Sequence, residues 1–282
     1  MRQKLKYLIV GLIFLAGLGL MLYPVVSNWY IQRHQGSVIA EYDEEAAKLS
    51  KQQIEEELEA ARTYNKSLLG NVVLKDPFDV DALEEQNQDY DSLLNPGGDG
   101  VMGSVEIPGI DVYLPIYHTT SAEVLKKGVG HLQNSSLPVG GEGTHAVLSG
   151  HTALPAAEMF DDLSKVEEGD VFYIHVLDQV LAYEVDQIKV VLPEEMSDLE
   201  IQEGKDLCTL VTCTPYGINT HRLLVRGHRV KYVETKVQEQ KEVSKSKTDI
   251  RPVIAGAVAG VVVLFIIIFA VRRRRKHRNQ QR

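Results

Sequence analysis

Two long stretches without a charged residue lie near opposite ends of this 282-residue chain, at 7–32 and at 252–271. A membrane-spanning helix needs roughly 20 mostly apolar residues at about 1.5 Å of rise each, and both stretches are long enough. We therefore expect two transmembrane helices, the first preceded by a short cytoplasmic start within residues 1–32. Any water-soluble fold is then built from the residues between them.

The first stretch has an alternative interpretation as a cleaved signal peptide. Arg2, Lys4 and Lys6 form a basic start, and an apolar run follows at 8–22. The exit from this run at 22–30 contains no convincing small-x-small cleavage site, and its aromatic residues suit the outer membrane interface. We expect a retained anchor, although the sequence leaves cleavage open.

The charge distribution predicts which parts of the chain face the cytoplasm. Basic residues favour the cytoplasmic side of a membrane, and here they precede the first stretch and follow the second in the tail at 272–282. Residues 31–250 are then extracellular, and they carry 19 bases against 39 acids, a formal charge of −20. This charge argues against a nucleic-acid partner. The basic tail could be an RNA-binding patch, but its place directly after an apolar span indicates topology.

The extracellular part begins with a helical pattern. Apolar residues recur at three- to five-residue steps from 37 to 69, which predicts a helix, and 70–100 is rich in turn residues and reads as a loop or flap. The chain then divides into a helix-and-flap segment, a β domain, a polar tether, the second span and the basic tail, at 33–102, 103–235, 236–251, 252–271 and 272–282.

Short apolar runs alternate with turn residues through the β domain. Strands are expected at 101–107, 112–116, 144–149, 171–176, 180–191, 208–212 and 222–230, with short helices at 121–127 and 156–163. Strands this numerous and short favour a mainly β fold closed into a barrel.

The chain contains two cysteines, Cys208 and Cys213, in one expected strand. Residues five apart in a strand face opposite sides and lie about 17 Å apart, whereas a disulfide needs roughly 4.4 to 6.8 Å between Cα atoms. Both thiols should be free. Cys213 is the candidate nucleophile because it ends its strand beside a turn-rich segment, although a free cysteine often only packs.

A cysteine nucleophile needs a base, and attack on an acyl carbon needs a donor for the oxyanion. His151 follows an expected strand as Cys213 does, and His131 is its best competitor from spacing. Arg222 lies beside Cys213 if the intervening turn forms a hairpin, while Arg226 lies about 13 Å further along the strand. Each of these side chains could equally be packed or a surface charge.

The motifs around these residues resemble the sortase family. Thr-Leu-Val-Thr-Cys at 209–213 matches the TLxTC signature, Leu-Ser-Gly-His at 148–151 matches the segment with the catalytic histidine, and Arg222 follows the cysteine by nine residues, as the family's catalytic arginine does. The resemblance spans 103–232. It implies an eight-stranded sortase-type closed β-barrel with Cys213 as nucleophile, His151 as acid/base and Arg222 as the oxyanion-stabilising group.

Two further features are similar to the pilin-polymerising class, the class C sortases. That class has a second transmembrane helix and an N-terminal flap with Asp-Pro-aromatic, which Asp76-Pro77-Phe78 matches. The resemblance implies that the flap is a lid, in which Asp76 pairs with Arg222 and Phe78 covers Cys213. Pro77 fixes its own φ and restricts Asp76, which helps to present both side chains in one turn.

The resemblance also implies the reaction and the location. Cys213 cleaves an LPxTG-like sorting signal through a thioester, and an acceptor lysine of a second pilin subunit takes the acyl group at the outer face of the cell membrane. No cofactor or metal is expected, since the sequence contains no metal-ligand cluster or calcium loop. Two alternatives remain open: a housekeeping sortase that anchors proteins to peptidoglycan through a peptidoglycan precursor, and a non-enzymatic membrane scaffold.

Overall fold

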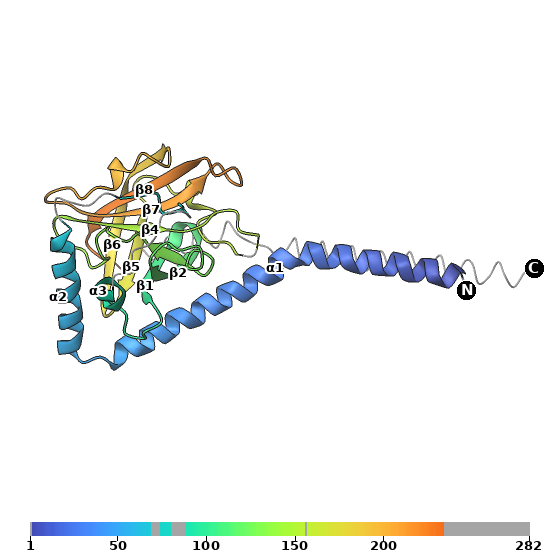
Figure 1. The fold of residues 1–282 in the computed structure, drawn as a ribbon, viewed down its shortest axis with the longest axis horizontal. Coiled ribbons are helices and arrows are strands. Elements are labelled where there is room, and N and C mark those ends of the chain that lie inside the picture. The colour runs from blue at the N-terminus through green and yellow to red at the C-terminus, as the bar shows by residue number, and fades with distance from the viewer. Residues whose placement is uncertain (1, 69–73, 80–87, 156, 234–282) are drawn as a thin grey trace, which may run out of the picture.

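The computed structural model describes residues 2–68, 74–79, 88–155 and 157–233, and it combines a closed β-barrel with a long N-terminal helix that extends far beyond it (Figure 1). The expected tether at 236–251, second span at 252–271 and basic tail at 272–282 lie outside the described residues. The part of the β domain that forms the barrel is described apart from residue 156.

Helix α1 (Arg2–Lys48) contains the first apolar stretch and runs without interruption across the expected boundary at residue 32. Most of its large apolar side chains from Ile9 to Tyr30 are exposed, and none of the most apolar window is buried. Within the described ranges this is the one helix long and apolar enough to cross a membrane. These properties support an N-terminal membrane anchor.

The helix expected at 37–69 is divided in two. α1 ends at Lys48 and α2 (Lys51–Ser67) begins after Ser50, whose hydroxyl accepts a hydrogen bond from the Gln53 amide at 3.3 Å. The Gln53 side chain in turn accepts from the Ser50 amide at 2.9 Å, which completes a capping box. The expectation of helix was therefore correct and its continuity was wrong, because this box starts a new helix.

Side-chain hydrogen bonds fix both helices to the barrel. The Tyr42 hydroxyl of α1 donates to the Met102 carbonyl at 2.9 Å and accepts from the Leu177 amide at 3.0 Å. The Asn65 amide group of α2 bonds to both backbone groups of Leu137, at 3.0 and 2.7 Å. The same helix that carries the apolar stretch is therefore attached directly to the β domain.

The barrel has the strand order β1-β2-β3-β4-β7-β8-β6-β5, and pairing of β1 with β5 closes it. Its strands are β1 (Val101–Ile107), β2 (Val112–His118), β3 (Val129–His131), β4 (Thr144–Ser149), β5 (Val171–Val176), β6 (Gln179–Val191), β7 (Asp206–Thr214) and β8 (His221–Val230). The expected eight-stranded closed barrel is confirmed. The strand pattern alone had missed the three-residue β3, and β1 begins two residues before the expected domain boundary at 103.

The two short helices expected inside the β domain are not helical. At 121–127 the chain makes turns, with the Leu125 amide bonded to the Ser121 carbonyl at 2.9 Å, and it enters β3 directly afterwards. The segment expected at 156–163 is described from residue 157, and residues 157–162 form no helix: the Asp161 carboxylate accepts from the Ala153 and Met159 amides, each at 2.9 Å, and such bonds favour a loop over a helix. The 3₁₀ helices are η1 (Pro108–Ile110), η2 (Leu163–Lys165) and η3 (Ser197–Leu199), and α3 (Gln88–Ser92) precedes the barrel.

Three neighbouring strands carry the candidate site on their outer side. Leu148 of β4, Leu210 of β7 and Val225 of β8 point into the central core, so the residues that alternate with them point outward. We call the outward set the three-strand face; its members used below are His145, Val147, Ser149, Thr209, Val211, Cys213, Arg222, Leu224 and Arg226. Its middle is apolar and both ends are polar.

Candidate active site

Cys213 and Arg222 are directly opposite each other in the antiparallel pairing of β7 with β8. The hairpin inferred from the turn-rich segment therefore forms, while Arg226 lies opposite Thr209, four positions away. The Cys213 side chain is mostly covered, with the residue 7% exposed. Both cysteines are free thiols, as expected, and Cys208 is fully buried in the barrel core.

His151 lies two residues beyond β4, at the same end of the barrel. The Gly150 amide donates to the Val211 carbonyl at 3.0 Å, and the Thr212 hydroxyl donates to the Gly150 carbonyl at 2.7 Å. A side chain at Gly150 would place its Cβ 2.7 Å from the Phe160 ring, so glycine is needed for this close approach. These contacts fix the turn that carries His151 against β7.

The Asp-Pro-Phe segment closes over this end of the barrel. Arg222 Nε donates to Asp76 Oδ1 at 2.8 Å and Nη2 donates to Oδ2, while Nη1 donates to the Asn219 and His221 carbonyls at 3.1 Å each. The Arg222 guanidinium also lies 5.1 Å from the centre of the Phe78 ring. Four of the five guanidinium protons are thus committed in this state.

Phe78 and Leu74 attach the segment to the three-strand face. The Phe78 and His151 ring centres are 5.5 Å apart, and Pro77 is buried. Both apolar side chains pack on one cluster, formed by Leu132, Val147, Val191, Met196, Leu199, Val211 and Leu224. The segment therefore covers the apolar middle of the three-strand face as well as the end that carries Cys213 and Arg222.

In this closed arrangement the surroundings favour the neutral forms of Cys213 and His151. Burial raises the pKa of the Cys213 thiol; the Arg222 charge opposes this rise and the Asp76 carboxylate adds to it. Burial lowers the pKa of His151, and the positive charge of Lys126 lowers it further. Burial by itself lowers the pKa of Arg222. The hydrogen bonds to Asp76, together with the electrostatic effects of the Cys213 sulfur and the Asp76 carboxylate, outweigh burial and leave this pKa raised. At neutral pH the thiol keeps its proton and the imidazole is uncharged.

Comparison with known proteins agrees with these features. A family model described as a sortase domain matches residues 105–230. The chain is 34% identical over 131 residues to Sortase D of Bacillus subtilis (strain 168), which is 45% of this chain and 63% of that protein. It is 46% identical to a solved sortase C of Streptococcus pneumoniae, with a TM-score of 0.62, covering 70% of this chain and 97% of that one. This chain belongs to the sortase family.

The class expected from the Asp-Pro-Phe motif is also supported. Sortase C-1 from Actinomyces oris is 48% identical, with a TM-score of 0.61 over 64% of this chain and 99% of that structure. The sortase fold and class C likeness make this protein a cysteine transpeptidase, and the scaffold alternative is wrong. The described residues contain no group of three or more histidine, cysteine or acidic side chains placed to hold a metal ion.

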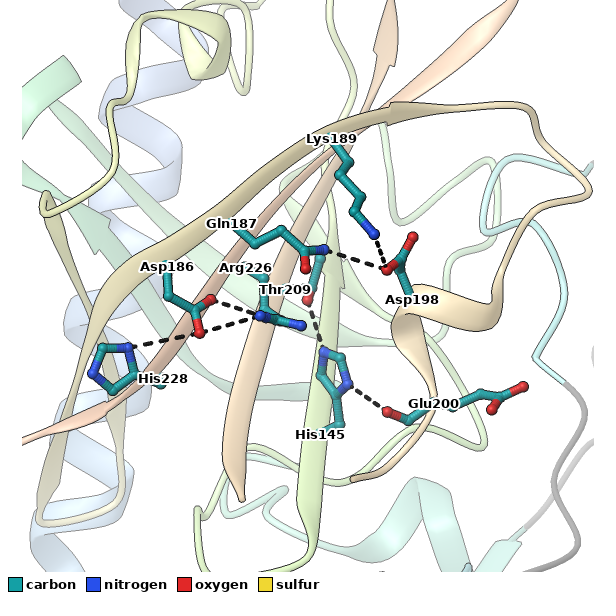
Figure 2. Close-up of polar contacts among 9 residues, drawn as sticks. All are labelled: His145, Asp186, Gln187, Lys189, Asp198, Glu200, Thr209, Arg226 and His228. Carbon is teal, nitrogen blue, oxygen red and sulfur yellow. Dashed lines mark hydrogen bonds and ion pairs between the residues drawn. The ribbon is translucent and has the colours of Figure 1, made fainter. Parts of the chain in front are cut away.

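The opposite end of the three-strand face in this sortase is a closed polar cluster (Figure 2). The Thr209 hydroxyl donates to His145 Nε2 at 2.7 Å, and His145 Nδ1 donates to the Glu200 carbonyl at 2.9 Å. Arg226, the second candidate arginine, forms a bidentate pair with Asp186 at 2.9 and 3.2 Å. Arg226 is therefore committed away from Cys213.

The competing histidine, His131, is a structural residue. It is fully buried, its Nε2 donates to the Ser136 carbonyl at 2.8 Å, and its Nδ1 accepts from the Tyr90 hydroxyl of α3 at 2.8 Å. Burial lowers its pKa to about 4. These contacts exclude His131 as a partner of Cys213, whereas His151 follows β4, the strand that pairs with the Cys213 strand β7.

Sequence reasoning missed three contributors to this site: Leu74, which anchors the Asp-Pro-Phe segment; Thr212, whose hydroxyl holds the His151 turn; and Ser149, which shares the outward face. Strand alternation from Cys213 and His151 could have identified Ser149. Nothing in the local sequence indicates the contacts of Leu74, because they are made across the barrel surface.

Proposed function

We propose that this sortase polymerises pilins. It cleaves an LPxTG-like sorting signal between threonine and glycine and joins the threonine carbonyl to a lysine amine of a second pilin subunit. The observation that carries the proposal is the bond between Asp76 and Arg222, made while Phe78 lies against His151. The solved Streptococcus pneumoniae relative is described in connection with pilin substrate specificity, and another relative is a sortase C1 of a pilus island.

The first acyl transfer uses Cys213 as nucleophile, His151 as acid/base and Arg222 as oxyanion donor. The Cys213 proton passes to His151, the thiolate attacks the threonine carbonyl carbon, and the resulting oxyanion is stabilised by the Arg222 guanidinium. His151 then gives its proton to the glycine nitrogen as the C–N bond breaks. The products are a threonyl thioester on Cys213 and a free amino-terminal glycine fragment.

The lid controls this step in two ways. The donors Nε and Nη2 of Arg222 can turn to a substrate carbonyl only after Asp76 leaves. Departure of Asp76 also removes a carboxylate that raises the pKa of Cys213, while the favourable effect of Arg222 remains. The pair is mostly buried, at 8% and 13% side-chain exposure, and the desolvation cost of such pairs offsets much of their attraction. Departure of Asp76 alone would leave the buried Arg222 charge without a partner, so lid opening is coupled to the arrival of a substrate carbonyl at Arg222.

The apolar cluster beneath Leu74 and Phe78 explains how a sorting signal can displace the lid. Leu74 and Phe78 occupy it in the closed state. The leucine and proline of an LPxTG-like signal can replace those two side chains, so that one apolar contact is exchanged for another. The signal is then held with its threonine carbonyl near Cys213 and Arg222.

The second acyl transfer releases the product. A neutral lysine amine attacks the thioester carbon, the C–S bond breaks, and His151 accepts the proton that the amine loses. Cys213 leaves as a thiolate and recovers its proton from His151, which returns the enzyme to its starting state. Exclusion of water by the lid and by the bound pilin limits hydrolysis of the thioester.

We further propose a membrane arrangement with two spans. α1 is the first, and the apolar stretch at 252–271, outside the described residues, is the second. Basic residues at both ends of the chain favour cytoplasmic termini, which leaves the barrel at the outer surface of the cell membrane. Pilins with sorting signals and acceptor lysines are then substrates on the same side.

The test uses the full-length chain in lipid nanodiscs with a pilin tail bearing an LPxTG signal and a pilin domain bearing the acceptor lysine. Mass spectrometry should find an isopeptide between them with the native enzyme and none with Cys213→Ala. Transfer to a peptidoglycan-precursor amine in place of the pilin lysine would favour the housekeeping alternative. Absence of any Cys213-dependent adduct, even when the lid is weakened by Asp76→Ala and Phe78→Ala, would refute the proposal.

A further inference from the structure

Ser149 carries a buried hydroxyl that the mechanism above does not use. The residue is fully buried at the end of β4, and no protein group within the described residues hydrogen-bonds to its Oγ. Nearly all buried polar groups in proteins have a partner, and an unpaired one reduces stability. A hydroxyl kept in this state is therefore a candidate for a ligand contact.

The strand register places this hydroxyl beside the reacting centre. Ser149 lies opposite Val211 in the parallel pairing of β4 with β7, and Cys213 is two residues further along. With strands about 4.8 Å apart and a rise of about 3.3 Å per residue, the Cα atoms of Ser149 and Cys213 are roughly 8 Å apart. Both side chains are on the three-strand face, so Ser149 Oγ and Cys213 Sγ point to the same side of the sheet.

The surroundings of Ser149 explain its lack of a partner. Its neighbours on the face, Val147 and Val211, are apolar and belong to the cluster on which Leu74 and Phe78 pack. The closed lid therefore covers this region with hydrocarbon and aromatic groups. A polar partner can arrive only with whatever replaces the lid.

The substrate brings such a partner. Resting on the proposed function, the residue whose carbonyl is attacked is a threonine, and its hydroxyl is the side-chain polar group nearest Cys213 in the acylation step. We infer that Ser149 binds the threonine hydroxyl of the sorting signal and so determines the preference for threonine before the cleaved bond. A site with a buried polar group left unpaired rejects an analogue that lacks the matching group.

The test compares two peptide substrates that differ by one isosteric change, LPxTG and LPxVG. Cleavage by the full-length enzyme in nanodiscs should favour threonine over valine in kcat/KM by about tenfold or more, consistent with one hydrogen bond. Ser149→Ala should reduce that preference to below about threefold, through a loss on the threonine peptide alone. Ser149→Thr, which retains the hydroxyl, should restore part of the preference.

Ser136→Ala is the matched control. The Ser136 hydroxyl is also fully buried, but it accepts a hydrogen bond from the His145 amide at 3.0 Å. This variant should lower the unfolding temperature and leave the threonine preference intact, whereas Ser149→Ala should not lower the unfolding temperature.

Three results would overturn the inference. An unchanged threonine preference in Ser149→Ala would refute it while leaving the proposed function intact. A fall in unfolding temperature equal to that of Ser136→Ala would mean that the Ser149 hydroxyl is already paired in the folded protein. Failure of the native enzyme and of the lid variant to cleave either peptide would refute the proposed function and this inference with it.

Discussion

Two arginines on β8 make the same kind of ion pair in different structural settings. Arg222 pairs with Asp76, which belongs to the short lid segment, and Arg226 pairs with Asp186, which belongs to the neighbouring strand β6. Asp186 is held in position by the paired residues Val185 and Gln187 on either side of it in β6, whereas Asp76 belongs to no strand. The first pair is therefore suited to opening and closing, and the second to permanent support.

The two ends of the three-strand face differ in the same way around their histidines. His151 follows β4 in a turn and contacts the lid through Phe78. His145 lies within β4, fully buried, with both ring nitrogens hydrogen-bonded. Under the proposed lid mechanism, one end of the face exchanges its partners, whereas the other end keeps them.

The largest expected difference between the two ends is in catalysis. Arg222→Ala should lower kcat/KM for sorting-signal cleavage by about 10² to 10³, the usual cost of losing an oxyanion donor. Arg226→Ala should retain most of the activity of the native enzyme, because Arg226 lies four positions from Arg222 along β8 and its guanidinium is held by Asp186. Peptide-cleavage kinetics on both variants, with circular dichroism to verify folding, measure the difference. Equal losses would remove the functional distinction between the arginines.

The second largest expected effect is a loss of folding stability in acid that comes from the buried His145. Burial lowers the pKa of His145 from 6.5 to about 4, so the unfolded chain takes up a proton between these values while the folded protein does not. Stability contributed by the neutral ring is therefore full above about pH 6.5 and is lost as the pH falls towards 4, by on the order of 3 kcal/mol. Urea unfolding at pH 7 and pH 5 should show about 2 kcal/mol of this loss, because pH 5 is still above the pKa of the folded protein.

His145→Gln should be less stable at pH 7 and show a flatter pH dependence over this range. His228→Gln changes a largely exposed imidazole of the same polar cluster and serves as the control. If His145→Gln keeps the full acid sensitivity of the native protein, the buried ring is not its source.

The smallest expected effect is on the rate at which Cys213 is alkylated. Asp76→Ala combined with Phe78→Ala should accelerate alkylation of Cys213 by about tenfold, which corresponds to roughly 1.4 kcal/mol in the lid equilibrium. The pH midpoint of alkylation should also move down, because Asp76 raises the pKa of Cys213 in the closed state. Fully buried Cys208 should not react, so the rate reports on Cys213 alone.

Asp186→Ala is the counterpart of the lid variant, because it breaks the ion pair at the opposite end of the face. It should leave the alkylation rate unchanged. A rate that rises in Asp186→Ala as much as in the lid variant would show that general loosening of the barrel exposes the thiol, and an unchanged rate in the lid variant would count against a lid.

The sequence predicted the parts of the fold that depend on local patterns. Alternating apolar residues indicated seven of the eight strands, and the three residues of β3 are too few to show a period. The apolar pattern continues across Ser50, so it predicts one helix, although the Ser-x-x-Gln sequence of the capping box starts α2 there. The prediction of two short helices was wrong, because the Asp161 hydrogen bonds and the adjacent β3 strand favour turns over helix.

The candidate site was predictable to the extent that strand register determines it. A hairpin between Cys213 and Arg222 was sufficient to place them opposite each other. The pairing of Asp76 with Arg222 joins residues 146 apart in sequence, so it was expected only from the family resemblance. Ser149 was missed because its importance depends on which side of β4 faces the lid.

The unbroken course of α1 keeps the barrel close to the apolar stretch. The helix continues from residue 32, the last of the uncharged stretch, to Lys48, which is about 24 Å at 1.5 Å per residue, and Tyr42 in this portion is bonded to the barrel. The β domain also lies back along the helix, because the Gln35 side chain donates to the Lys127 carbonyl at 2.9 Å and the Glu158 amide donates to the Asn28 side chain at 3.0 Å. In the proposed membrane arrangement the barrel therefore rests near the bilayer surface, where a short spacer between a sorting signal and its own membrane anchor is sufficient for the signal to reach the enzyme.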